Sequence, residues 1–301
     1  MAFFCIGSPH KNKNWYDYRV YQNLIDELEG LGHKYKVGAI NRIYFLGAPL
    51  RDDYPDVGTF DPLANNIALL YCHADKIRNW HGFNHIFAAS TGMKYFLLLR
   101  KLKKMDFSGK KYLPDWHKVK VLPPFSSLKN NSTVKKDYSC DISFVGSQRI
   151  RPIVEDTLDI VKKHNINFKI FGYDWDAYEG NPIAKDYWQG SGIPYEDFPA
   201  LANSSKICLV DHPEDLNREA TVSHKYIDLL ASKACVISDY NLGVKYGYKG
   251  LTYKTRAELE TMILKLLGDN KLRESIKLRQ FSLAERLTTL ETVKQIVKRF
   301  V

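Results

Sequence analysis

The sequence predicts an α/β protein of two domains, and three observations carry this prediction. Short apolar runs typical of buried strands alternate with amphipathic segments along the whole chain, a pattern typical of parallel sheets covered by helices. The chain has 301 residues, which at about 150 residues per domain favours two domains. A polar, turn-forming segment over residues 126–139 interrupts the alternation. We therefore predict domains over 1–125 and 140–301, joined by this linker.

The first domain is expected to begin with a strand over residues 2–6 that ends at Gly7-Ser8-Pro9. An amphipathic helix over 16–31 follows and is closed by Gly32. Further apolar runs predict strands over residues 35–40, 43–46, 67–71, 85–89 and 119–122.

The second domain repeats the alternation. Strands are predicted over residues 141–145, 168–171, 207–210 and 234–238, and helices over 152–164, 198–203, 223–231 and 257–267. Residues from about 271 to 300 have helical periodicity throughout. We expect that the last helix, about residues 280–301, can pack back on the first domain.

Composition excludes several classes of protein. With 45% hydrophobic and 26% charged residues, the chain is not of the disordered type. No apolar run is long enough for a transmembrane helix, and the N-terminus lacks the pattern of a signal peptide. Five widely spaced cysteines without a CxxC pair suit reduced thiols rather than disulfides or a zinc site. We expect a cytoplasmic protein that can associate with the inner face of the membrane.

The positive charge is concentrated in one stretch. Forty-four basic minus 34 acidic residues give +10, and residues 94–120, with nine basic and two acidic residues, contribute +7. Apolar residues at helical spacing over 94–105 predict a helix beside these cations. Such a helix can attract anionic lipid head groups or phosphate backbones through residues 94–111, or it can be an ordinary packing helix whose outer face is solvated by lysines. The cations considered for an acceptor or membrane surface are Lys94, Arg100, Lys101, Lys103 and Lys104.

Two segments of the second domain are suited to anion binding. After the strand 141–145, Gly146 and Ser147 form a turn, and Arg149 and Arg151 precede Pro152 at a predicted helix start. Glycine lets the backbone approach a ligand closely, and helix N–H groups with arginines favour an anion. A plain turn with exposed arginines remains the alternative.

The second segment is the helix over 223–231. Ser223 is its expected N-cap, after an irregular polar loop over 212–221. Asp228, about one and a half turns into this helix, can accept hydrogen bonds from a ribose diol, or it can be an ordinary surface or capping carboxylate.

Four motifs in order resemble a known family. FVGSxRxR, FGxDW, GxxYEDFPALxNSSKICL and SHKYIDLLASKACVIS are together similar to the C-terminal half of group-1 glycosyltransferases of the GT-B fold, and closest to the CgeB-like branch. The resemblance covers about residues 140–270. It implies two Rossmann-like domains facing a cleft, a nucleotide-diphosphate sugar as donor substrate, and no cofactor or metal. The pattern Asp174-x-Asp176 matches a metal-binding motif of the other glycosyltransferase fold, but it lies within a GT-B order of motifs.

The resemblance also assigns roles to residues. It places the diphosphate near Gly146, Ser147 and Arg149, the base beside Tyr195 and the backbone of Ile193, phosphate at Ser223 and Lys225, and the ribose on Asp228. Arg151 is counted with the donor-binding residues because its charge lies beside the same turn. Two positions differ from the family pattern. Asp228 stands where the family usually has the longer glutamate, and Lys233 stands where glycine is frequent.

The first domain would supply the acceptor side. His10 and Asp17, in and after the loop that follows the first strand, are able to take a proton from an acceptor hydroxyl, although a plain loop histidine and a helix-start carboxylate are the alternatives. His73 and the segment Ser90-Thr91-Gly92 are further cleft candidates.

Three functions are compared. The first is a metal-independent glycosyltransferase with a glycan or lipid-linked acceptor. The second is a basic nucleic-acid-binding or regulatory module without catalysis; the dispersed aromatics and the absence of HTH, RRM and zinc patterns count against it. A sugar transferase acting on nucleic acid combines the two, since a basic cleft suits a polyanionic acceptor. The third, a dehydrogenase, lacks GxGxxG after either first strand.

Overall fold

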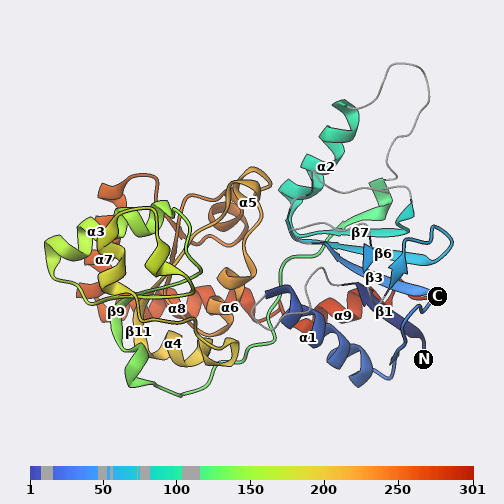
Figure 1. Ribbon diagram of the computed structural model, residues 1–301, viewed down its shortest axis with the longest axis horizontal. Helices are drawn as coiled ribbons and strands as arrows, with labels where there is room; N and C mark the ends of the chain where they lie inside the picture. Colours follow the sequence, from blue (N-terminus) through green and yellow to red (C-terminus); the bar gives the residue numbers. More distant parts are fainter. Residues whose placement is uncertain (8–15, 47–52, 55–56, 73, 75–81, 104–115) are drawn as a thin grey trace. The chain divides into compact units, whose positions relative to one another are not determined.

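The computed structural model divides into two compact units (Figure 1). It describes residues 1–7, 16–46, 53–54, 57–72, 74, 82–103 and 116–301. Unit 1 consists of residues 1–125, 214–221 and 287–301, and unit 2 of residues 126–213 and 222–286. The chain therefore leaves unit 2 for eight residues, returns, and ends in unit 1. The polar segment 126–139 groups with unit 2.

Unit 1 contains a six-stranded sheet in which all neighbours are parallel. Its order is β2 (Lys34–Tyr35), β1 (Phe3–Gly7), β3 (Asn41–Leu46), β6 (Asn65–Leu70), β7 (His85–Ala88) and β8 (Val119–Val121). Every residue of β6 is buried, as expected for a parallel strand covered on both faces. A short antiparallel pair, β4 (Asp53–Tyr54) with β5 (Gly58–Thr59), lies outside this sheet.

The helices of unit 1 come from three parts of the chain. They are α1 (Tyr16–Gly30), α2 (Thr91–Lys103), α5 (Glu214–Arg218), α9 (Thr289–Val297) and the 3-10 turn Trp116–Lys118. Helix α9 packs on α1, and its Val293 and Ile296 are fully buried in the core of unit 1. The C-terminal segment is thus a structural part of the unit formed by the first third of the chain.

Unit 2 contains a five-stranded parallel sheet. Its order is β10 (Phe168–Phe171), β9 (Cys140–Val145), β11 (Ser205–Val210), β12 (Val236–Ser238) and β13 (Leu251–Thr252). After β9 the chain forms β10 on one side of that strand, and it then forms β11 on the other side and continues to β12. The connections that leave β9 and β11 therefore run in opposite directions. In open parallel sheets the crevice at such a switch point, at the carboxyl ends of the strands, is where ligands bind.

The helices of unit 2 are α3 (Pro152–His164), α4 (Phe198–Ser204), α6 (His224–Ala231), α7 (Arg256–Gly268) and α8 (Asn270–Ala284). Short 3-10 turns occur at Lys136–Tyr138, Trp175–Ala177, Pro182–Tyr187 and Tyr195–Asp197, and a π-turn at Gly243–Gly247. Helix α3 shows how local sequence sets the boundaries. Pro152 occupies its first turn, and Asn165 ends it in the left-handed conformation.

Helix α6 ends in a similar way. Lys233 has φ +60°, its N–H bonds to the carbonyl of Leu230, and the N–H of Ala234 bonds to the carbonyl of Leu229. These two bonds form a Schellman cap, in which the left-handed residue is usually glycine. The structure therefore explains why glycine is frequent at this position, and Lys233 adopts the same conformation with its ammonium 4.5 Å from the Phe281 ring centroid.

The predicted fold class is confirmed, because both units are built on parallel sheets with helices. Several predicted elements need correction. The strand over 35–40 is limited to β2, since the chain turns at Gly38, where φ is +70°. The single helical stretch over 271–300 is two helices, because Thr288 caps a new one by accepting from the Glu291 N–H. The loop over 212–221 contains helix α5. Among the described helices, none is both long and apolar enough to cross a membrane.

Candidate functional site

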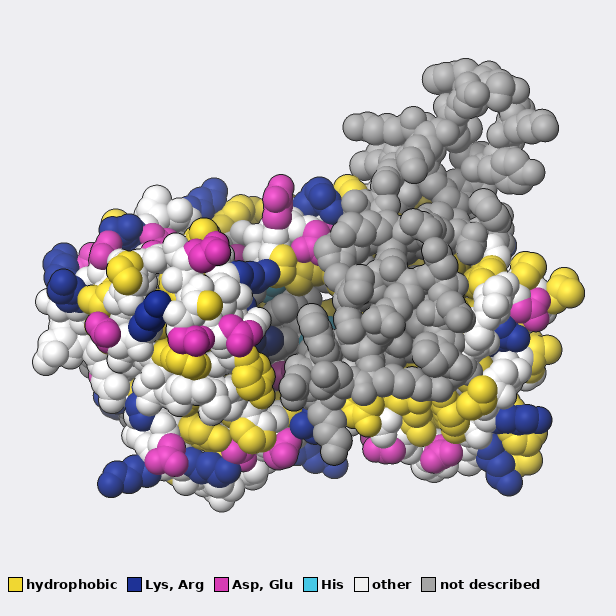
Figure 2. Space-filling model, viewed as in Figure 1, with side chains coloured by type: hydrophobic (Ala, Val, Ile, Leu, Met, Phe, Trp, Pro, Cys, Tyr) yellow, Lys and Arg dark blue, Asp and Glu magenta, His cyan; other side chains and the backbone are white. Residues whose placement is uncertain are grey.

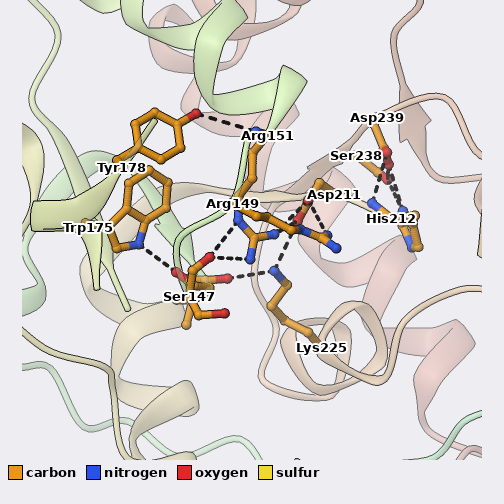
Figure 3. A network of polar contacts seen from close by, with 12 residues as sticks. Ser147, Arg149, Arg151, Trp175, Tyr178, Asp211, His212, Lys225, Ser238 and Asp239 are labelled. Atoms are coloured by element: carbon orange, nitrogen blue, oxygen red, sulfur yellow. Dashed lines mark hydrogen bonds and ion pairs between the residues drawn. The ribbon is translucent and has the colours of Figure 1, made fainter. Parts of the chain in front are cut away.

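Polar side chains converge at the switch point of unit 2 (Figure 3). Strands β9 and β11 are paired neighbours, so the segments that follow Val145 and Val210 begin at the same edge of the sheet. The first segment carries Arg149 and Arg151, the second carries Asp211, and helix α6 adds Lys225 (Figure 3).

Asp211 is the centre of this cluster. Its carboxylate accepts hydrogen bonds from Arg149 Nη2 at 2.7 Å and from Arg151 Nη1 at 2.8 and 2.7 Å, and Lys225 Nζ lies 3.5 Å from Oδ1. The Asp211 side chain is only 6% exposed, whereas that of Arg149 is 42% exposed. One buried carboxylate therefore holds three cations, and at least one of them can reach a ligand from solvent.

The charges in the cluster shift one another's pKa values. Burial would raise the pKa of Asp211, but Lys225, Arg151 and Arg149 outweigh it and hold this pKa far below its usual range. Burial lowers the pKa of Lys225 to about 8; Asp211 opposes this shift, whereas Arg151 and Arg149 add to it. Three cations against one carboxylate leave an excess of +2, which suits a bound polyanion.

Backbone groups and an aromatic ring fix the cations in place. Lys225 Nζ donates to the carbonyl of Val145 at 2.6 Å, and Arg151 donates to the carbonyl of Ser147 from Nε at 2.9 Å and Nη2 at 2.5 Å. The Phe144 ring lies beneath both, with its centroid 5.0 Å from the Arg151 guanidinium carbon and 4.7 Å from Lys225 Nζ. The cations are thus oriented before any ligand arrives.

Two glycines allow the turns at this edge to approach each other. A side chain at Gly146 would come within 2.9 Å of the Arg151 guanidinium, and one at Gly172 would overlap the carbonyl oxygen of Gly146. That carbonyl also accepts a hydrogen bond from Trp175 Nε1 at 2.8 Å. Gly146, which the sequence places in the predicted phosphate turn, is therefore required by the packing of this turn independently of any ligand.

A second cluster surrounds Asp228. This carboxyl, 2% exposed, accepts hydrogen bonds on Oδ1 from Ser126 Oγ at 2.6 Å and Tyr195 OH at 3.0 Å. Burial raises the pKa of Asp228 to about 7, and the bonds from Ser126 and Tyr195 limit the rise. The carboxyl is thus already a hydroxyl acceptor in the absence of a ligand. Ser126, from the predicted linker, was not predicted to take part.

Helix α6 connects the two clusters. Lys225 and Asp228 are three residues apart, so they lie on one face with their Cβ atoms about 5–6 Å apart. Ser223 begins the helix, and its hydroxyl accepts from the Tyr226 N–H at 3.3 Å. A ligand with a phosphate group and a vicinal diol about one helical turn apart would match this face.

The loop before Tyr195 carries Ile193. Within the described chain, the backbone N–H and C=O of Ile193 form no hydrogen bond with another residue. No hydrogen bond in the described part of the chain joins this residue to either cluster, so its link to the site is its position two residues before Tyr195.

A histidine lies beside the Asp211 cluster. His212 Nδ1 lies 2.7 Å from Asp239 Oδ1, and its backbone N–H donates to Asp239 Oδ2 at 2.9 Å. Ser238 Oγ lies 3.2 Å from the same ring nitrogen (Figure 3). These contacts fix the chain directly after Asp211 and therefore help to position its carboxylate.

Metal ligation depends on which acidic, thiol or imidazole side chains lie close together in the described residues. No group of three or more His, Cys, Asp or Glu among them is arranged to hold a metal ion. Asp174 and Asp176 are exposed on either side of the buried Trp175.

The acceptor-side candidates are described only in part. His10, His73 and Lys104 lie outside the described residues. Asp17 lies in α1, and Lys94, Arg100, Lys101 and Lys103 lie in α2, but of this group only the Lys94 side chain is described, and it is partly buried. Ser90 is hydrogen bonded to the α5 segment, with its Oγ donating to the Glu219 carbonyl at 3.0 Å.

Sequence reasoning missed Asp211, on which the cation cluster is centred. The sequence did contain an indication of its role. Asp211 directly follows the buried run 207–210, and the strand formed by that run pairs with the strand that precedes Arg149. The residues predicted from the motifs do fall into two groups, Gly146, Ser147, Arg149, Arg151 and Lys225 at one cluster and Tyr195 and Asp228 at the other.

Comparison with known proteins gives both a family and a fold. Residues 150–299 match the model of a family described as glycosyl transferase-like. No curated protein matches the chain in sequence.

Solved structures of glycosyltransferases share the fold over nearly the whole chain. A DNA-modifying β-glucosyltransferase, crystallised with and without its substrate uridine diphosphoglucose, has a TM-score of 0.64 at 13% identity, with 99% of each chain covered. A glycosyltransferase of avilamycin A biosynthesis has a TM-score of 0.62 at 11% identity, covering 99% of this chain and 97% of its own. Sucrose-phosphate synthase from Thermosynechococcus elongatus has a TM-score of 0.60 at 11% identity, covering 99% and 98%. The fold is that of GT-B glycosyltransferases, and the CgeB-like branch is not singled out.

Removing the Asp211 carboxylate should destabilise unit 2. Breaking a buried ion pair from one side leaves charges uncompensated and costs about 3–5 kcal/mol. We therefore expect Asp211→Asn to lower the free energy of unfolding by about 3 kcal/mol in urea denaturation at pH 7. The pKa of Asp211 is lower in the folded protein than in the unfolded chain, where it is about 4. The stabilisation by this carboxylate is therefore fully present above about pH 4 and is lost as the pH falls toward the pKa of the folded state.

Asp156→Asn is the matched control. Asp156 pairs with Arg256, whose side chain is 52% exposed, so its loss should cost at most about 1 kcal/mol. Equal effects of the two substitutions would contradict a central role for Asp211.

Proposed function

Residues 150–299 belong to the glycosyl transferase-like family, and from this premise we propose that the protein transfers a sugar from a nucleotide-diphosphate donor to a glycan or lipid-linked acceptor without a metal. The observation that carries the proposal is the cluster of Arg149, Arg151 and Lys225 around Asp211. Its excess of +2, at the switch point of a parallel sheet, suits the diphosphate of such a donor.

The donor would lie along helix α6. Arg149, Lys225 and the turn at Gly146 and Ser147 would bind the diphosphate, and Arg151 would hold the turn in shape from its buried position.

The nucleoside would lie at the second cluster. Asp228 would accept the ribose hydroxyls in place of Ser126 and Tyr195. The α6 N-terminus at Ser223 adds its positive dipole end. The backbone of Ile193 would pair with the base.

These groups can also promote the reaction. When the bond between the sugar and the diphosphate breaks, the leaving diphosphate gains negative charge. Cations that are already oriented bind the leaving group more strongly as this charge develops, and so they lower the barrier. The candidates to take the proton of the acceptor hydroxyl remain His10 and Asp17, which follow β1 in the sequence.

Calorimetry with UDP, GDP and other nucleoside diphosphates tests the donor site. We expect one of them to bind the wild-type protein, and Arg149→Ala to weaken that binding by about tenfold or more, since hydrogen bonds to charged groups contribute about 1.5–3 kcal/mol. Arg256→Ala, which removes an arginine of similar exposure from an ion pair between α7 and α3, should leave the affinity unchanged. Absence of binding by every nucleoside diphosphate would refute the proposal.

The affinity should also depend on pH through Lys225. Its pKa of about 8 in the free protein means that the ammonium form declines as the pH rises through 8. A diphosphate binds the ammonium form better, so binding raises this pKa and the affinity should fall steadily between pH 7 and 9. Lys225→Arg keeps the positive charge throughout this range and should flatten the profile. An unchanged slope in that variant would assign the pH dependence to another group.

Transfer of a sugar onto nucleic acid is the second candidate. It is favoured by the +7 of residues 94–120, because the rest of the chain carries only +3, which is +10 minus +7. On the face of the molecule drawn in Figure 2, basic and acidic side chains are interspersed over the described surface. Of the basic stretch, Lys118 and Lys120 flank Val119 at the start of the edge strand β8. A DNA-modifying enzyme of the same fold adds weight to this candidate.

Binding assays separate the two kinds of acceptor. Fluorescence anisotropy with duplex DNA should show affinity that falls steeply with salt if nucleic acid is the acceptor, whereas sedimentation with phosphatidylserine vesicles should show binding if the acceptor is lipid-linked. Lys101→Ala/Lys104→Ala should weaken whichever binding occurs. Lys162→Ala/Lys163→Ala, which removes the same charge from α3, should not. Equal loss in both double variants would indicate a response to net charge alone.

A further inference from the structure

An exposed aromatic residue stands at the ligand-binding edge of unit 2. Tyr173 follows the end of β10 and is 50% exposed, although large aromatic side chains are usually well buried. The sequence motif FGxDW contains this residue, and none of the contacts that form the two clusters uses its ring.

The backbone of Tyr173 joins the two loops that would flank a nucleotide. Its carbonyl accepts a hydrogen bond from the Gln148 N–H at 3.0 Å, within the turn of the diphosphate cluster. The N–H of the preceding residue, Gly172, donates to the Ser191 carbonyl at 2.9 Å, within the loop that leads to Ile193. Tyr173 therefore lies between the proposed diphosphate and the proposed base.

The turn that carries Tyr173 is held firmly. Trp188 Nε1 donates to the carbonyl of Gly172 at 2.9 Å, and the next residue, Asp174, takes the left-handed conformation with φ +64°. The ring packs against Gly192, where an added Cβ would lie 3.1 Å from it. The ring thus has a fixed support beside the Ile193 loop, while half of the residue stays open to solvent.

A second tyrosine near this loop is already engaged. Tyr195, which the motifs place beside the base, donates its hydroxyl to Asp228, and its ring packs on Phe198 with 6.0 Å between centroids. The Ile193 backbone can pair with the edge of a base, but a planar ligand also needs a surface for its face. Base–aromatic stacking supplies such a surface for every nucleobase, since each has a π face.

We propose that the exposed Tyr173 ring is the surface on which the nucleobase of the donor stacks. The inference rests on the proposed function and adds a residue that determines affinity for the nucleoside part of the donor. It implies that the two parts of the donor are bound separately, the diphosphate by the cations around Asp211 and the base by Tyr173 with Ile193.

Calorimetry with a nucleotide and with inorganic pyrophosphate tests this division. We expect Tyr173→Ala to weaken binding of UDP or GDP, whichever the wild-type protein binds more tightly, by about tenfold, and to leave pyrophosphate binding within about twofold of the wild type. Tyr173→Phe keeps the ring and should bind both as the wild type does. Tyr246→Ala is the matched control, because Tyr246 is another exposed tyrosine of unit 2, on the turn Gly243–Gly247.

The outcomes distinguish this inference from the function on which it rests. If the wild-type protein binds a nucleoside diphosphate but Tyr173→Ala binds it equally well, or loses nucleotide and pyrophosphate in parallel, stacking on Tyr173 is refuted and the donor site stands. If Tyr246→Ala shows the same selective loss, the effect is not specific to Tyr173 and the inference fails. If the wild-type protein binds no nucleoside diphosphate at all, the proposed function is refuted, and the inference with it.

Discussion

The structure of the candidate site depends on one buried carboxylate. Asp211 holds Arg149, Arg151 and Lys225 at the carboxyl end of β11, and without it three cations could not share so small a volume. The attraction is strong because Asp211 is buried, and the same burial makes each unpaired charge costly. The remaining excess of +2 is the reason why the cluster favours an anion. A ligand that brings two or more negative charges completes the neutralisation that Asp211 begins.

The sheet decides where this carboxylate can act. Since β9 and β11 are adjacent and their connections diverge, the turn after Val145 and the residue after Val210 face the same space. Helix α6 then spans the distance from cation to hydroxyl acceptor within one turn, from Lys225 to Asp228. The rigid parts of the fold thus set a spacing that suits a nucleoside diphosphate. The glycines at 146 and 172 let the supporting turns pack closely enough for this to happen.

Asp228 illustrates how one position can have a structural role and also suit the proposed function. Its carboxyl is buried with a pKa raised to about 7, and it is satisfied by the hydroxyls of Ser126 and Tyr195. Two hydroxyl donors on one carboxylate oxygen resemble a vicinal diol in chemistry. Lys233 likewise adopts a left-handed conformation in which glycine is usual, and α6 still ends in a Schellman cap.

The sequence alone determined the α/β class, most strands and helices, and the motifs that contain Arg149, Arg151, Lys225 and Asp228. These features are local, because period, capping residues and turn glycines are written in short segments of chain. That the last helix can pack on the first domain was already expected from the sequence. Only the tertiary structure decided that Asp211 unites the cations, that Ser126 reaches Asp228, that residues 214–221 belong to unit 1, and that the chain end at Val301 reaches Asn41. Each of these depends on contacts between residues about 60 to 260 positions apart in the chain, as in the 60 between Arg151 and Asp211 and the 260 between Asn41 and Val301. Such contacts form because strand order and burial bring distant segments together, and neither is encoded in local periodicity.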